Sequence, residues 1–451
     1  MILGTVSARK PDDDWRLPMT SSAEPAESYS TGQRWIILLS AILGYVTDGY
    51  NLLIITFALP SITTSLGISA QQAGTIITVQ LVASIIGGAL FGRIADSHGR
   101  KKALTWSIAL FSVGALLSAF SWNYTTLLLT RLVAGIGLGG EWGVGMALFN
   151  EAWKRHRGLG ASVIQSSLPV GSLLAGVVAA QIIATSGPEG WRWSLATGCL
   201  PLVLCVVIRI WMPESKVWLR SRNERPARDE TALQVFREVR RSGASRRWLL
   251  AFGLVLGYMI SYYSVTSWMP TFIVETYDQG PSVWQEVNTF AVWVVVPLKI
   301  AFGLWGDKVG RKTATLVPAV FTLMGSIGIL VVSLGGEHTY PGSIWVWSLF
   351  WLFFLWSMGN AQASLMGAWL PESFETRIRA TATSTAYMFG RGVSALAPSL
   401  VAVLAFGNLG VGMGVASLVG VVLFVVCAIL LPETKPRNPT RQLPESNATV
   451  G

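Results

Sequence analysis

The sequence predicts an all-α membrane protein with twelve transmembrane helices, and three observations predict it. Of the 451 residues, 51% are hydrophobic and 13% are charged, against roughly 25% charged in an average soluble domain. The mean hydropathy is +0.50. Twelve apolar segments recur along the chain, most of them near or above the ~20 residues that a helix needs to cross a bilayer. This composition excludes a soluble domain, a disordered chain and a disulfide-rich secreted scaffold.

The apolar segments fall into two groups of six. We expect a first bundle over 34–212, a polar cytoplasmic linker over 213–247 and a second bundle over 248–432. The polar segments 1–33 and 433–451 are predicted to be cytoplasmic tails, the first of them disordered. The predicted spans are 35–59, 74–94, 103–121, 126–149, 159–184, 194–212, 248–274, 283–305, 314–334, 343–369, 380–406 and 408–431.

Basic residues predict the orientation of these spans. Lys and Arg gather in the connections after spans 2, 4, 8 and 10, and Arg192 is the main exception in the alternate connections. Because short loops rich in Lys and Arg stay in the cytoplasm, both termini are predicted to be cytoplasmic. The formal net charge of +10 is explained by these loops, so no nucleic-acid partner is expected. The partner that the composition does imply is the lipid bilayer.

The reactive side chains give no sign of an enzyme. The three cysteines lie within apolar segments, and the three histidines lie in separate loops without the spacing of a zinc site. A constellation of nucleophile, base and metal is not visible. We therefore expect no disulfide, no metal, no cofactor and no catalytic residues.

An internal repeat relates the two halves. The segment 92–101, GRIADSHGRK, recurs at 303–312 as GLWGDKVGRK, an offset of 211. Further landmarks recur in the same order at offsets of 219 to 222: Glu151 with Glu372, Arg157 with Arg379, and Pro213-Glu214-Ser215 with Pro432-Glu433-Thr434. Three landmarks in matching order indicate a duplicated six-helix unit.

The repeated segments 92–101 and 303–312 are similar to the signature loop of the major facilitator superfamily of secondary transporters. The chain resembles this superfamily over roughly residues 34 to 435. The resemblance implies two six-helix bundles, related by a pseudo-two-fold axis, that rock around a central site. It also implies that the loop charges form the inner gate, although they could be solvated charges that only set topology. These gating candidates are Asp96, Arg100, Glu151, Arg157, Asp307, Arg311, Glu372 and Arg379.

Span 1 carries a carboxylate deep in the membrane. Asp48 lies about thirteen residues into the span, which at 1.5 Å per residue is about 20 Å from its inner end. An ionised carboxylate is costly at that depth, and a group that prefers to bind a proton there suits proton coupling. We predict that Asp48 is the proton carrier, with a structural aspartate as the alternative.

Span 4 adds two more charged residues. Its three glycines four residues apart predict a stripe for close helix packing: Gly135, Gly139 and Gly143. Arg131 lies on the side of this stripe, whereas Glu141 is roughly 80° away around the helix. Arg131 is therefore predicted to tune the proton affinity of Asp48, and Glu141 is a second titratable candidate. A purely structural salt bridge is the alternative.

Span 11 holds Arg391 between two glycines, where its planar guanidinium can bind a carboxylate through two nitrogens. We predict that Arg391 anchors an anionic substrate. Lys299 in span 8 ranks second, because it lies near the inner end and its side chain could reach the membrane surface instead. Other polar side chains could line the cavity or bond a neighbouring helix: Tyr50, Asn51, Gln165, Asn360 and Gln362.

The pattern RLVAGIGLGGEWG at 131–143 is similar to the proton-coupled carboxylate symporters of the superfamily, including the sialate, lactate and aromatic-acid groups. Asp-Gly-Tyr-Asn at 48–51 is similar to the Asp-Gly-aromatic-Asp of the aromatic-acid group, with Asn51 in place of the second acid. The Pro-Glu-Ser and Pro-Glu-Thr landmarks are similar to those of sugar porters.

We therefore expect a symporter of the plasma membrane, in a bacterial inner membrane, that imports a small organic anion with protons and works as a monomer. A monocarboxylate or an aromatic acid is the expected substrate. Moving one negative charge inward against 100 mV costs about 2.3 kcal/mol, and a co-transported proton cancels that charge. The alternatives are a porter of a neutral sugar or polyol, for which Arg391 has no obvious use, and a membrane sensor that transports nothing.

Overall fold

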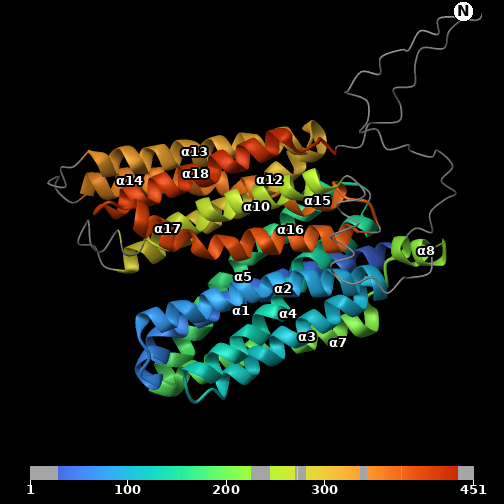
Figure 1. The fold of residues 1–451 in the computed structure, drawn as a ribbon, viewed down its shortest axis with the longest axis horizontal. Helices are drawn as coiled ribbons and strands as arrows, with labels where there is room; N and C mark the ends of the chain where they lie inside the picture. The colour runs from blue at the N-terminus through green and yellow to red at the C-terminus, as the bar shows by residue number, and fades with distance from the viewer. Residues whose placement is uncertain are drawn as a thin grey trace, which may run out of the picture.

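The computed structural model describes residues 29–153, 155–224, 244–269, 272, 281–335, 343–376 and 378–434. Within these ranges every regular element is a helix, and the helices form two groups that lie against each other (Figure 1). Helices α1 to α7 form one group and α10 to α18 the other. The predicted tails lie almost entirely outside the described residues, and so does most of the predicted linker.

The first group contains five long helices and a broken sixth. Their bounds are α1 (Thr31–Leu66), α2 (Ala70–His98), α3 (Arg100–Ala119), α4 (Tyr124–Ala152), α5 (Arg157–Ser186), η1 (Gly187–Glu189), α6 (Gly190–Ala196), η2 (Thr197–Cys199) and α7 (Pro201–Trp211), followed by α8 (Lys216–Glu224). Capping boxes at Ser30, Ser69 and Asn123 begin α1, α2 and α4, since each side chain accepts a hydrogen bond from a free amide of the first turn.

The second group repeats this plan. Its elements are α10 (Ser245–Thr266), α12 (Pro281–Val309), α13 (Arg311–Leu334), α14 (Ser343–Gly359), η3 (Asn360–Ala363), α15 (Met366–Glu372), α16 (Arg379–Val393), η4 (Ser394–Leu396), α17 (Ala397–Leu404) and α18 (Leu409–Leu430). Gly99 before α3 and Gly310 before α13 have φ of 107° and 116°, a conformation that glycine adopts without strain. The repeated loops therefore share a backbone turn as well as a sequence.

Eleven helices of the described residues are long and apolar enough to cross a membrane. The predicted continuous span over 343–369 is wrong in detail, because the chain there divides into α14, with 17 residues, η3 and α15. The span predicted over 380–406 is confirmed as the candidate membrane span Arg379–Leu404, which contains the short 3₁₀ turn η4. Breaks at membrane depth are tolerated where protein or a cavity, rather than lipid, surrounds the free backbone groups.

The glycine stripe of α4 packs as predicted. A Cβ atom on Gly135 or Gly139 would overlap a carbonyl oxygen of α2, and one on Gly143 would overlap Ser384 of α16. Small residues let helix backbones approach closely. The stripe therefore packs α4 against its own bundle with two glycines and against the other bundle with the third.

We expect Gly139→Ala to lower the melting temperature of the purified protein. The added methyl would collide with the carbonyl of Ser84 in α2, which cannot swing away, and such overpacking costs about 1 to 3 kcal/mol. Gly145→Ala is the matched control on the same helix, because a Cβ there meets no atom within 4 Å. Equal melting shifts for the two variants would contradict the close approach of α2 and α4.

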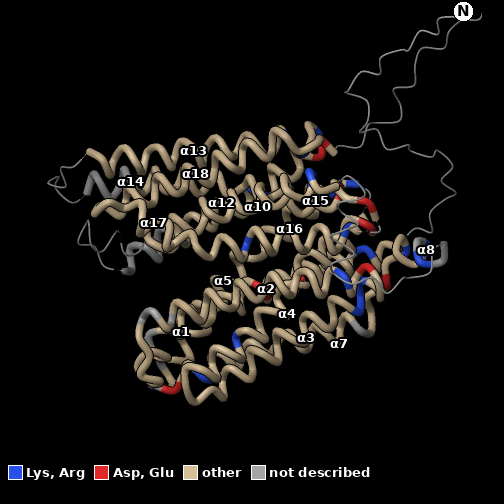
Figure 2. Tube along the Cα trace, viewed as in Figure 1, with Lys and Arg blue, Asp and Glu red and all other residues tan. Residues whose placement is uncertain are grey.

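Charged residues gather at one end of the molecule, where α8 and α15 lie, and are sparse along the helices (Figure 2). This end is called the charged end below. Arg192, the exception to the orientation pattern, forms an ion pair with Glu189. Hydrogen bonds from Ser65 and from Arg192 lower the pKa of the Glu189 carboxyl, so the exceptional positive charge has a local counter-ion.

Candidate functional site

The two groups of helices meet at a buried ion pair. Asp48 of α1 and Arg391 of α16 form a two-pronged ion pair. Nη1 of Arg391 donates to Oδ2 of Asp48 at 3.0 Å, and Nη2 donates to Oδ1 at 3.2 Å. The side chains are 0% and 2% exposed. Arg391 lies twelve residues into α16, or about 18 Å along the helix axis. The predicted proton carrier and the predicted substrate anchor are thus in direct contact.

Glu141 of α4 is a second carboxylate beside this pair. Its Oε1 lies against Gly44 of α1, one turn before Asp48. Its Oε2 is buried and has no hydrogen-bond partner among the described residues. The charges of Asp48 and Arg391 both act on Glu141. Two buried carboxylates therefore lie near one guanidinium, and the described ion pair to it comes from Asp48.

Three aromatic residues complete the contact between the bundles. Tyr387, one turn before Arg391, stacks on Trp142 with ring centroids 3.6 Å apart and planes 16° apart. Its hydroxyl shares a 2.9 Å hydrogen bond with Tyr45 of α1. These three residues were not predicted from the sequence, although Trp142 directly follows Glu141 and Tyr387 precedes Arg391 by one turn.

Gln165 and Lys299 continue the site toward the break in the tenth predicted span. Gln165 of α5 accepts a 2.8 Å bond from Nε1 of Trp142 and donates a 3.2 Å bond to the carbonyl of Ala363 in η3. Lys299 of α12 is 5% exposed, and its Nζ lies 3.5 Å from the carbonyl oxygen of Gln165. Lys299 therefore points into the protein, and the alternative that it reaches the membrane surface is wrong.

Asn360 and Gln362, both predicted to be polar lining residues, lie in η3 itself and are buried. The Oε1 atom of Gln362 has no hydrogen-bond partner among the described residues. The structure thus places these two residues at the break, on a segment that packs against α12 and therefore on the Lys299 side of the site.

Three other predicted residues lie in helices of the first bundle and have no described hydrogen bond or ion pair with Arg391. The nitrogens of Arg131 are buried and have no hydrogen-bond partner in the described part of the chain, and the ion pairs found there do not join Arg131 to Asp48 or Glu141. The Tyr50 hydroxyl bonds Thr197. Asn51 donates a 3.2 Å bond to the carbonyl of Thr47. The structure does not bring these three together with Arg391.

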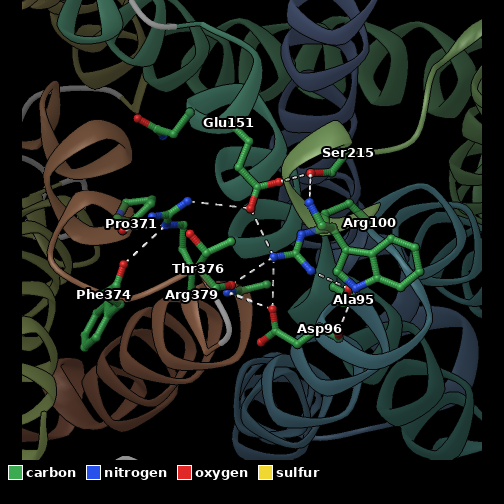
Figure 3. Close-up of polar contacts among 12 residues, drawn as sticks. Ala95, Asp96, Arg100, Glu151, Ser215, Pro371, Phe374, Thr376 and Arg379 are labelled. Carbon is green, nitrogen blue, oxygen red and sulfur yellow. Dashed lines mark hydrogen bonds and ion pairs between the residues drawn. The ribbon is translucent and has the colours of Figure 1, made fainter. Parts of the chain in front are cut away.

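At the charged end, a first latch joins α2 to α16 (Figure 3). Asp96 accepts hydrogen bonds from the amides of Ala380, at 3.3 Å, and Thr381, at 2.7 Å, and from the Thr381 hydroxyl at 2.6 Å. Nη2 of Arg100 lies 3.2 Å from Asp96 and 3.0 Å from Glu151. A carboxylate at a helix N-terminus is favourable because free amides and the helix dipole point toward it.

A second latch repeats the first between α12 and α5. Asp307 accepts bonds from the amides of Gly158, at 2.8 Å, and Leu159, at 3.0 Å. Arg311 bonds Asp307 at 2.8 Å and Glu372 at 3.2 Å. In both latches an acid of one bundle thus caps a helix of the other.

Two longer ion pairs cross between the bundles: Arg379 with Glu151 at 3.7 Å and Arg157 with Glu372 at 3.5 Å. All eight predicted gating residues therefore belong to these networks. Four further members of these networks belong to the repeated landmarks but were not predicted as gating residues. They are Ser215 and Thr434, whose hydroxyls donate to Glu151 and Glu372, and Glu214 and Glu433, which accept the first amides of α3 and α13.

Comparison with known proteins assigns this architecture to a family. The Major Facilitator Superfamily profile matches residues 41–363. The sialic acid transporter NanX of Escherichia coli strain K12 is 30% identical over 397 residues, 87% of this chain and 92% of that protein. The cis,cis-muconate transport protein of Acinetobacter baylyi is 26% identical, over 90% and 98% of the two chains. A solved structure of the proton:xylose symporter XylE matches with a TM-score of 0.69 and 22% identity, over 90% and 98%.

The profile match and these relatives, which cover most of the chain, define a transporter of small metabolites. The chain belongs to the Major Facilitator Superfamily. It crosses the plasma membrane several times, and it is a transporter rather than an enzyme.

Proposed function

We propose that this protein imports a small organic anion, a monocarboxylate or an aromatic acid, together with protons. The observation that carries the proposal is the two-pronged pairing of Asp48 with Arg391 across the two bundles. A substrate carboxylate offers Arg391 the same two oxygens that Asp48 offers. The names of the relatives NanX and the muconate transport protein, both transporters of acids, support this substrate class.

The pair supplies a mechanism of coupling. While Asp48 is ionised, it neutralises Arg391 and occupies its guanidinium. When Asp48 binds a proton, it no longer balances the buried positive charge, and a substrate carboxylate takes its place because a buried charge without a partner is costly. Proton and anion therefore bind together. Glu141 is the second protonatable group beside this exchange.

The latches supply the gate. On this proposal both termini and the charged end face the cytoplasm, twelve spans form the bundles 34–212 and 248–432, and the linker 213–247 joins them as a single working subunit. The latches then hold the cytoplasmic side closed while the outer side admits substrate. Rocking of the bundles breaks both latches and opens the path inward.

Uptake into proteoliposomes tests the proposal. Labelled monocarboxylates, dicarboxylates, aromatic acids, sugars and polyols are offered first under an imposed pH step and then under an imposed voltage. We expect external acid to accelerate uptake of at least one carboxylate at least tenfold over equal pH. Uptake of sugars or polyols alone would support the neutral-substrate alternative, and a complete absence of uptake would support the sensor.

A further inference from the structure

Within the described part of the chain, Lys299 is a buried cation without a counter-ion. Its side chain is 5% exposed, and among the described residues its ammonium has a single hydrogen bond, at 3.5 Å, to the carbonyl of Gln165. No carboxylate among the described residues lies within ion-pair distance of Lys299. The arginines Arg100, Arg311 and Arg391, also buried between the bundles, each have one. Removing an ammonium group from water without an anion is unfavourable.

Lys299 and Arg391 lie at similar distances along their helices from the two latches. It is eight residues from Asp307 of the second latch, and Arg391 is ten residues from Thr381 of the first. At 1.5 Å per residue, both cations are therefore about 12 to 15 Å from the latches.

A row of contacts connects the two cations across the interface. Gln165 contacts Lys299, Trp142 bonds Gln165, and Tyr387 stacks on Trp142 one turn before Arg391. Lys299 and Arg391 are thus the two ends of one row, contributed by α12 and α16 of the same bundle.

The segment beside Lys299 offers further unused polar atoms. Helix α12 packs against η3, where Oε1 of Gln362 is buried without a partner among the described residues. The hydroxyl of Ser364, which follows η3, is also buried and has no partner there. Buried polar groups are nearly always satisfied by protein, water or a ligand. Their position favours a polar group of a ligand at this end of the row.

Resting on the proposed function, we propose that the transported anion carries two acidic groups, one bound by Arg391 and the other by Lys299. A monocarboxylate satisfies Arg391 and leaves Lys299 without an anion. A dicarboxylate pairs with both cations and brings the acceptor oxygens that the Lys299 ammonium lacks. The site therefore prefers a dicarboxylate over the monocarboxylate of the same carbon skeleton.

Binding to the purified full-length protein tests this preference with three matched pairs, each differing by one carboxylate: benzoate and terephthalate, sorbate and cis,cis-muconate, and hexanoate and adipate. In at least one pair we expect the dicarboxylate to bind at least tenfold more tightly to wild type. Lys299→Gln should weaken that dicarboxylate at least tenfold and change its monocarboxylate less than twofold. Lys299→Arg should keep the preference.

Lys308→Gln is the matched control, since Lys308 is an exposed lysine of the same helix. It should bind both members of each pair as wild type does. If Lys299→Gln does not fold, as judged by its melting curve, Lys299→Met replaces it and is judged in the same way.

The inference is overturned if wild type prefers the dicarboxylate in none of the pairs, or if the preference survives in the Lys299 variants that lack the charge. Acid-driven uptake of a monocarboxylate alongside either result would leave the proposed function standing. Absence of acid-driven carboxylate uptake would instead remove the proposed function.

Discussion

Asp48→Asn abolishes concentrative uptake, with accumulation of the transported anion at least a hundredfold below wild type under an inward proton gradient. Asparagine has nearly the shape of aspartate and fits beside Arg391, but it neither carries a charge nor binds a proton. The variant therefore resembles the protonated state permanently, and substrate binding no longer changes with the protonation of residue 48. Removing one member of a buried ion pair costs about 3 to 5 kcal/mol, which the substrate anion offsets when it binds.

The measurement compares net uptake with exchange in proteoliposomes. Exchange of labelled for unlabelled substrate needs no net proton movement, so we expect it to persist in Asp48→Asn and to be insensitive to pH. Glu189→Gln is the control, because it removes a carboxylate at an exposed position outside the spans. Accumulation by Asp48→Asn equal to wild type at every pH would reject the role of Asp48.

Opening of the molecule at its charged end is the second large effect, expected when Asp96→Asn and Asp307→Asn are combined. Each carboxylate accepts at least two backbone amides of a helix in the opposite bundle. A hydrogen bond to a charged group contributes about 1.5 to 3 kcal/mol. Asparagine keeps one acceptor oxygen, so each substitution removes about one such bond, and the two together remove roughly 3 to 6 kcal/mol from the closed state. About 5.5 kcal/mol converts a 1:99 equilibrium into 99:1, and the inward-open population should therefore rise strongly.

A cysteine at position 145 reports this opening. The native Cys199, Cys205 and Cys427 are first replaced by alanine, and Gly145→Cys is added where a side chain meets no atom within 4 Å. Labelling by a membrane-impermeant maleimide from the cytoplasmic side should be at least tenfold faster in the double variant, with each single variant intermediate. Glu375→Gln, an exposed acid at the same end, should label as wild type. Unchanged labelling of the double variant would mean that the latches do not hold the gate.

Much of this fold is predictable from one sequence because hydropathy and charge report on the membrane directly. The repeated loops predicted which residues form the latches, since both copies preserve the acid and the arginine one turn apart. The break at η3 and the turn at η4 were not predictable in this way. Windows over 343–369 and 380–406 measure apolar content, and short 3₁₀ segments such as Asn360–Ala363 do not change that content.

For the central site, the sequence predicted how far along its helix each charged residue lies, but not which neighbouring helix its side chain faces. The positions of Asp48 and Arg391 along their spans placed both near the membrane centre, and the structure pairs them. Arg131 was expected to act on Asp48, yet it shares a side of α4 with Gly135, and that side packs against α2 rather than α1. The sequence of α4 does not tell which helix covers this side. The roles of Trp142 and Tyr387 depend on which helix lies opposite, and that information is absent from each helix alone.

In both latches, the hydrogen bonds between the bundles are donated largely by backbone amides and accepted by an aspartate. Leu159 and Ala380 contribute main-chain amides to Asp307 and Asp96, and every residue except proline has such an amide. Mutation can therefore alter the side chains at these two positions over long evolutionary times without weakening the fit between the halves. The fit depends instead on the two aspartates, whose side chains accept these bonds.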